Sequence, residues 1–178
     1  MTKTSSSLRI TFALTALLLA GCQSRVASYG RVEVCSVVVP IVAAQVGQVD
    51  SSRDTSGDAL AGSCSIEFEG TAGRGRISFS LFTTASMAST HQPLDAVARV
   101  AMAEAQQTYD QVPSNLLSDV AGTSGFYVLG GKFQQAMLLD RGALLDVGSS
   151  SGSLTQEQGD KLVRAAWKAL LDYRPPNK

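Results

Sequence analysis

The chain has few of the residues from which catalytic and metal sites are usually built. His91 is its only histidine, and Cys22, Cys35 and Cys64 are its only cysteines. A structural zinc site draws several ligands from Cys and His, and a catalytic serine needs an adjacent base, most often a histidine. The composition therefore predicts a protein that is not an enzyme and that binds no metal or cofactor.

Neither sign of charge is in excess. The 178 residues include 15 basic and 15 acidic side chains, and no stretch of the chain is rich in Lys and Arg. Nucleic-acid-binding domains carry clustered basic residues, and electrostatic docking on anionic lipid is indicated by a polybasic segment. The sequence therefore indicates no nucleic-acid partner and no polybasic membrane contact.

Long apolar runs are also lacking, with one exception near the start. Ile10–Ala20 is mostly apolar and follows Lys3 and Arg9, but it is shorter than the roughly 20 residues that span a bilayer. A basic head, a short apolar core and small residues before a cleavage site are typical of a secretory signal peptide. The run ends in Leu19-Ala20-Gly21-Cys22, which resembles the lipobox of bacterial lipoproteins.

This resemblance implies that residues 1–21 are a lipoprotein signal peptide and that Cys22 opens the mature chain. Cys22 then carries diacylglycerol on its sulfur and usually an acyl chain such as palmitate on its amino group. Gln23 stands where Gram-negative lipoproteins retained in the inner membrane tend to have Asp. We therefore expect a lipid-anchored envelope protein, with the outer membrane facing the periplasm favoured over the inner membrane and the cell surface. The alternative is an ordinary signal peptide with a coincidental cysteine.

Residues 22–30 are mostly polar and rich in small residues, and we expect them to form a tether. Residues 31–178 have the size of a single domain. Cys35 and Cys64 remain as an even pair in an exported chain, which predicts a disulfide. A metal site would need further ligands, and a thioredoxin-like redox centre would need two cysteines separated by only two residues.

The region before the second cysteine is harder to interpret. Val32–Val37 is rich in β-branched residues, whereas Val39–Gly47 fits a short helix with Pro40 at its first position and glycine just past its end. A strand there would need Pro40 at a sheet edge, and we expect the helix. Asp50–Gly62 is rich in Ser, Asp and Gly, which predicts a loop. The spacing of its aspartates does not match an EF-hand.

The rest of the chain alternates between strand and helix patterns. Cys64–Glu69 and Arg76–Phe82 each alternate apolar and polar residues around a glycine-rich connection, which predicts a β-hairpin. The remaining expected elements, in chain order, are a helix at 93–109, strands at 125–129, 132–140 and 143–147, a connector at 148–153 and a helix at 155–173. The sum is an α+β domain with an antiparallel sheet of about five strands, two long helices, one short helix and one disulfide.

This pattern resembles a set of small envelope lipoproteins of unknown function, best known from actinobacteria. In those proteins a first cysteine opens a short helix that begins with Pro and ends in Gly, and a second cysteine opens the first strand. Cys35, Pro40, Gly47 and Cys64 stand at these places, although the usual aromatic after the second cysteine is missing. The resemblance implies an accessory or binding role outside the cytoplasm, with no known chemistry.

Three patterns that suggest chemistry have simpler explanations. Residues 148–152 match the G-x-S-x-G nucleophile elbow, but no histidine follows them, and the lysines after them are not held in place by any pattern. Glu67 and Glu69 share a strand face and would suit a sugar, yet an exposed sheet face looks the same. His91 is expected to be solvated, and Trp167 to pack in the core.

Two non-catalytic functions follow from these observations. The first is a membrane-anchored protein that binds an envelope protein as an accessory subunit or inhibitor. It would bind through an exposed sheet face or edge, or through the loops at 50–62 and 83–92. The second is a lipoprotein that binds a lipid or small apolar ligand between the sheet and the alanine-rich helix at 93–109. We expect the first.

Overall fold

A seven-stranded antiparallel sheet forms the centre of the computed structural model, which describes residues 24–55, 57–70, 73–112, 123–150 and 152–176. Two meanders, β1-β2-β3 and β5-β6-β7, meet where β3 pairs with β7, and the full strand order is β1-β2-β3-β7-β6-β5-β4. The strands are β1 (Gln48–Thr55), β2 (Gly62–Gly70), β3 (Gly73–Thr83), β4 (Asp110–Gln111), β5 (Thr123–Leu129), β6 (Lys132–Asp140) and β7 (Ala143–Ser149).

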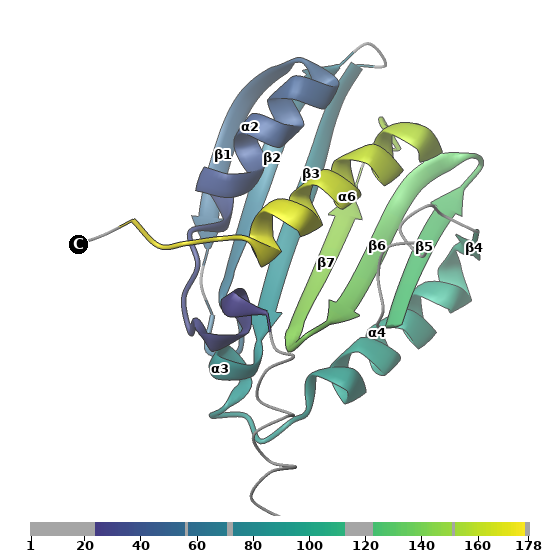
Figure 1. Ribbon diagram of the computed structural model, residues 1–178. Coiled ribbons are helices and arrows are strands. Elements are labelled where there is room, and N and C mark those ends of the chain that lie inside the picture. The colour runs from purple at the N-terminus through teal and green to yellow at the C-terminus, as the bar shows by residue number, and fades with distance from the viewer. Residues whose placement is uncertain (1–23, 56, 71–72, 113–122, 151, 177–178) are drawn as a thin grey trace, which may run out of the picture.

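Helices cover the two faces of this sheet unequally. On one face, α2 (Val34–Val46) packs against β1 and β2, and α6 (Gln156–Leu171) lies beside α2 and packs against β6 and β7 (Figure 1). On the other face, α4 (Leu94–Thr108) packs against β5, β6 and β7. Two short elements, η1 (Arg25–Ser28) and α3 (Thr84–Met87), lie together at one end of the sheet. The fold is therefore α+β, as predicted.

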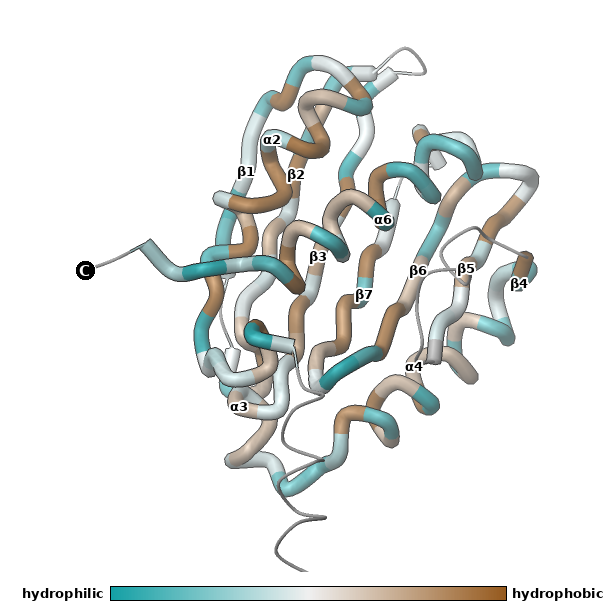
Figure 2. The backbone as a smooth tube through the Cα atoms, in the orientation of Figure 1, coloured by the Kyte–Doolittle hydropathy of each residue, from teal (hydrophilic) through white to brown (hydrophobic). Residues whose placement is uncertain are grey.

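The main core lies between the sheet and the pair α2 and α6. Alternate residues of β2 and β3 point into it, including Ile66, Phe68 and Phe79, all of them buried. Apolar segments follow these strands and the overlying helices in Figure 2. A second, smaller cluster holds Met102 of α4 against Met137 and neighbouring side chains of the opposite face. The period-two pattern of the strands thus separates two differently covered faces.

The helix expected before Gly47 is confirmed, but it begins earlier than predicted and spans residues 34–46. All of them belong to the helix α2, so the β-rich stretch Val32–Val37 is not a strand, and Pro40 lies inside the helix rather than at its first position. The Pro40 side chain is exposed, whereas Val38 and Val42 are fully buried. Burial of this apolar face outweighs both the β-branched composition and the backbone hydrogen bond lost at proline. Gly47 follows the helix with a φ of 102°, as its predicted position requires.

The predicted loop at 50–62 is wrong over its first half. Residues Gln48–Thr55 form β1, which pairs along its length with β2 and has a bulge between Val49 and Ser51. β1 is an edge strand and nearly all of it is exposed, so its polar composition resembles that of a loop. With the short β4 at the opposite edge, the sheet has seven strands rather than about five.

The expected tether also differs from the structure from Ser24 onward. Val26 and Ala27 of η1 are buried, and the Ser24 backbone N–H donates to the carbonyl of Arg141 at 2.8 Å. The ring of Tyr29 contacts the edge of Tyr173 with the centroids 5.9 Å apart. These contacts make residues 24–29 part of the packed domain, and Cys22 lies outside the described residues.

The hairpin, the helix at 93–109, the three strands after residue 123 and the last helix are confirmed as elements. α6 begins at the predicted capping box, in which Thr155 Oγ1 accepts from the Gln158 N–H and the Gln158 side chain accepts from the Thr155 N–H. β7 continues to Ser149, so the predicted connector at 148–153 begins later than expected. None of the described helices is both long enough and apolar enough to cross a membrane.

Candidate functional site

The face of β1–β3 opposite α2 carries polar side chains. Because side chains alternate along a strand, the residues between the buried ones of β2 and β3 point to this face. They include Ser65 and Glu67 on β2 and Arg74, Arg76 and Ser78 on β3. α4 covers the corresponding face of the other meander, where it packs against β5, β6 and β7. We call the polar part over β1–β3 the open face.

A groove runs across the open face near the β2–β3 turn. Its volume is about 470 Å³, and its walls include Asp50, Glu67, Arg74, Arg76 and Ser150. A second hollow of about 260 Å³ shares Arg76 and Ser150 with it and extends past Ser78 towards Tyr109 at the end of α4. The two hollows are neighbours with charged side chains among their walls, and we call them together the groove.

An ion pair organises the groove. The Arg76 guanidinium donates to Oε1 of Glu67, and Ser51 Oγ donates to Oε2 of the same carboxylate at 3.4 Å. The hydrogen bond from Arg76, followed by its charge, holds the pKa of the Glu67 carboxyl below its usual range, and the charge of Arg74 acts in the same direction. Both side chains of the pair remain about half exposed. The groove therefore presents an oriented carboxylate and guanidinium to any occupant.

A partly buried carboxyl lies on the same side of the sheet, on β7. Asp146 is opposite Ser80 of β3 and Met137 of β6, and the Gln135 amide donates to its Oδ1 at 2.9 Å. Burial raises the pKa of the Asp146 carboxyl, and the bond from Gln135 opposes this shift. Sequence reasoning did not single out this residue. The detectable signal is an acidic residue in the middle of the otherwise apolar run of β7.

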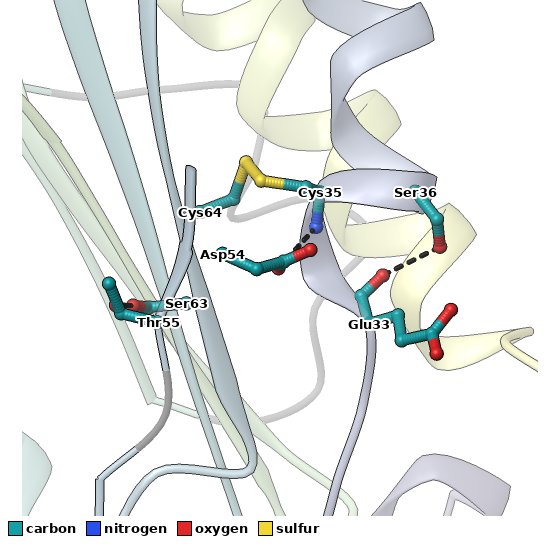
Figure 3. Close-up of a disulfide and its surroundings, with 7 residues drawn as sticks. All are labelled: Glu33, Cys35, Ser36, Asp54, Thr55, Ser63 and Cys64. Carbon is teal, nitrogen blue, oxygen red and sulfur yellow. Dashed lines mark hydrogen bonds between the residues drawn. A yellow bond between two sulfur atoms is a disulfide. The ribbon is translucent and has the colours of Figure 1, made fainter. Parts of the chain in front are cut away.

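The predicted disulfide is confirmed. Cys35 at the start of α2 bonds to Cys64 of β2, with 4.9 Å between their Cα atoms, and both side chains are buried. Oδ1 of Asp54 on β1 accepts a hydrogen bond from the Cys35 backbone N–H at 3.1 Å (Figure 3). The disulfide and this hydrogen bond fasten the first turn of α2 to the two outer strands.

The other residues considered from the sequence lie in several different places. His91 is exposed in the turn before α4 with a φ of 55°. Gly148 and Ser149 of the elbow-like motif belong to β7 and line the second hollow of the groove. Among the described residues, Ser149 Oγ is buried without a hydrogen-bond partner. Glu69 lies on the same face as Glu67 and is exposed. Trp167 is buried in α6, as predicted.

The three aspartates of the predicted loop lie in different environments. Asp50 lines the groove, Asp54 contacts the start of α2, and Asp58 is exposed in a turn. Within the described ranges, no group of three or more Cys, His, Asp or Glu side chains is arranged to hold a metal ion.

Comparisons with known proteins add no assignment to this geometry. No protein-family model, no curated protein and no solved structure matches the chain. The groove, the signal-like start of the sequence and the surfaces of the fold are therefore the features that bear on function.

Proposed function

We propose that the protein is a bacterial envelope lipoprotein, anchored through acylated Cys22, that binds a protein partner without catalysis. The observation that carries the proposal is the groove on the open face. It places an oriented Glu67–Arg76 pair among its walls on a three-stranded meander. Charged pairs of this kind give a partner orientation and specificity. The lipobox-like motif and the disulfide suit a location outside the cytoplasm.

The anchor is tested apart from the groove. We expect a palmitate analogue fed to cells to label the protein and a Cys22→Ala variant to lose both the label and the membrane fraction. Cys35 and Cys64 are consumed in the disulfide, so Cys22 is the acylation site that this experiment reports. Labelling that persists in Cys22→Ala, or an unlabelled wild type, would contradict the anchor.

The groove is tested by crosslinking in living cells. A photo-crosslinking amino acid is placed at Arg74 or at Ser78, one in each half of the groove. The matched control places it at Val100, whose side chain is 60% exposed on α4. We expect one dominant protein adduct from the groove positions and none from Val100. Equal adducts from all three positions, or lipid adducts alone, would sink the partner-binding proposal.

A second candidate function has one observation in its favour. An apolar groove of about 530 Å³ lies between α3, the start of α4 and the β6–β7 turn, with Met87, Leu94 and Leu139 among its walls. This is a size that suits a small apolar ligand. If the protein binds such a ligand there, a fluorescent fatty acid should raise its melting temperature, and a Leu139→Gln substitution should abolish the rise.

A further inference from the structure

Arginines from three distant parts of the chain line one hollow at the end of the molecule where the described chain begins. The hollow has a volume of about 530 Å³, and its polar walls include Arg25, Arg141, Asp172 and Arg174. They come from η1, the β6–β7 turn and the segment just after α6. Because no stretch of sequence is polybasic, only the fold produces this cluster.

Two of the three arginines in this hollow have no carboxylate partner among the described residues. Arg25 and Arg174 are exposed, and neither forms an ion pair within the described part of the chain. Arg141 donates from Nε to Asp140 at 2.7 Å, which uses one of its donors. Against these three guanidinium groups stand two carboxylates, Asp140 and Asp172. An arginine without a carboxylate partner offers a planar fork that fits phosphate oxygens.

Ser24, among the walls of the hollow, follows closely after the proposed lipid site at Cys22. The Ser24 N–H and Oγ both donate to the Arg141 carbonyl, at 2.8 and 3.0 Å. Ser24 is two residues from Cys22, and an extended chain covers at most about 3.6 Å per residue. A lipid on Cys22 therefore places the leaflet surface within about 7 Å of Ser24. This step rests on the proposed anchor.

The same end also carries apolar surface. Arg141 lines the cationic hollow, and the next residue, Gly142, lines the apolar groove with Met87 and Leu94. A cationic region beside an apolar one matches the boundary between lipid headgroups and acyl chains. The groove on the open face lies near the start of β3, whereas the Thr84 N–H, just past the end of β3, bonds the Gly142 carbonyl. The two surfaces are thus at opposite ends of the sheet.

We propose that the hollow between Arg25, Arg141 and Arg174 binds the phosphate of an anionic phospholipid in the leaflet that holds the anchor. Binding holds the domain upright with the β6–β7 turn on the membrane. The groove at the β2–β3 end then faces away from the lipid, where a protein partner reaches it. The proposal names a second, headgroup-specific contact beside the acyl chains.

Hydrogen exchange on vesicles tests this contact. The protein, purified as the cell makes it, is placed in vesicles of phosphatidylcholine alone or of phosphatidylcholine with phosphatidylglycerol. In the anionic vesicles we expect backbone amides at 139–143 and 171–174 to exchange about tenfold more slowly, the factor for a docked state populated to about 90%. High salt should remove this protection, because the Debye length falls to about 3 Å at 1 M.

Two matched triple variants identify the arginines. Arg25→Gln/Arg141→Gln/Arg174→Gln should lose the protection, whereas Arg53→Gln/Arg99→Gln/Lys161→Gln removes the same charge from exposed positions elsewhere and should keep it. Should the first variant fail to fold, Arg174→Gln alone, in the exposed segment after α6, should reduce the protection in part. Equal protection in both vesicle types, or protection that survives the loss of the three arginines, would overturn the proposal.

Two further measurements distinguish a failure of the proposed phospholipid contact from a failure of the proposed anchor. Glycerol phosphate that protects the same amides without vesicles would assign the hollow to a free phosphate ester and overturn the membrane contact. Mass spectrometry of Cys22 reports the anchor independently. A chain without acyl groups would refute the proposed anchor, and the same chain mixed with the two kinds of vesicle would still decide whether the arginines recognise anionic lipid.

Discussion

Arg76 lowers the pKa of the Glu67 carboxyl in the groove. Removing the guanidinium with Arg76→Gln takes away the first two causes of the lowered pKa, the hydrogen bond and the charge. We therefore expect the pKa of Glu67 to rise towards the ordinary glutamate value in this variant. An NMR pH titration of the carboxyl carbon measures it, and Arg99→Gln, which breaks the exposed pair with Asp95 on α4, is the control. An unchanged pKa in Arg76→Gln would contradict this account of the groove.

Asp146 has the opposite shift and the opposite effect on stability. Its pKa is raised by burial, so the folded state binds the proton more tightly than the unfolded state does. The wild-type protein therefore loses stability as the pH rises from the ordinary aspartate pKa of about 3.9 through the higher folded value. An Asp146→Asn substitution keeps an oxygen to accept from Gln135 and removes the titration.

We expect Asp146→Asn to be more stable than the wild type at pH 7 and to lose this advantage below about pH 4. Urea denaturation at a series of pH values measures the difference. The wrong result would be a difference that stays constant with pH, since an effect of packing alone would not titrate.

The joint between α2 and the sheet depends on the disulfide. Cys35 and Cys64 are 29 residues apart, and closing a loop of that length stabilises a fold by about 3–4 kcal/mol in the chain-entropy account. Cys35→Ala/Cys64→Ala should lower the free energy of unfolding by about that amount. Reduction with dithiothreitol should lower the wild type to the same value and leave the double variant unchanged. A wild type insensitive to reduction would show that α2 is held by packing alone.

Gly159 in the first turn of α6 is explained by close packing and not by helix propensity. A Cβ at Gly159 would lie 2.4 Å from Cγ of Phe133 on β6. Alanine would favour the helix by about 1 kcal/mol, but overpacking costs about 1–3 kcal/mol. We expect Gly159→Ala to destabilise the protein, measured by thermal unfolding.

Phe133→Leu provides the matched background for this substitution. With the ring removed, Gly159→Ala should cost less than it does in the wild type, so the double-mutant cycle should show a favourable coupling. Additive effects of the two substitutions would mean that the close approach of Gly159 to Phe133 is not the cause.

The elements that the sequence predicted well are those in which local pattern and burial agree. β2 and β3 alternate because one face is the core, and α6 begins at a capping box whose bonds are formed. β1 was missed because an exposed edge strand has no apolar face to reveal it. α2 was partly misread because its β-branched residues are helical only through packing on the sheet and α6.

The candidate sites were likewise only partly predictable from the sequence. Glu67 was noticed as a strand carboxylate, but its partner Arg76 comes from the next strand, and the register that joins them is a property of the sheet. The cluster of Arg25, Arg141 and Arg174 was invisible because its members are far apart in the chain. The disulfide was predictable because the count of cysteines and the expected compartment left one pairing.

At the scale of the whole molecule, the two halves of the chain are nearly symmetric, because each contributes a meander and a helix at its outer end. α2 precedes the first meander and α6 follows the second, and the two helices pack side by side on the same face. The β3–β7 pair joins the meanders within the sheet. The open face lies over the meander β1-β2-β3, which carries the disulfide. α4 covers the same side of the meander β5-β6-β7.

The contact between Tyr29 and Tyr173 has a consequence for chain connectivity. It brings the two ends of the described domain together, and Ser24 and Arg174 line the same hollow. The domain is thus suited to circular permutation. A chain that joins Arg174 to Ser24 by a short linker and opens at the exposed Gly130-Gly131 turn should keep the circular dichroism spectrum and the disulfide. Loss of both would mean that synthesis order, and not only the final set of contacts, is needed to reach this fold.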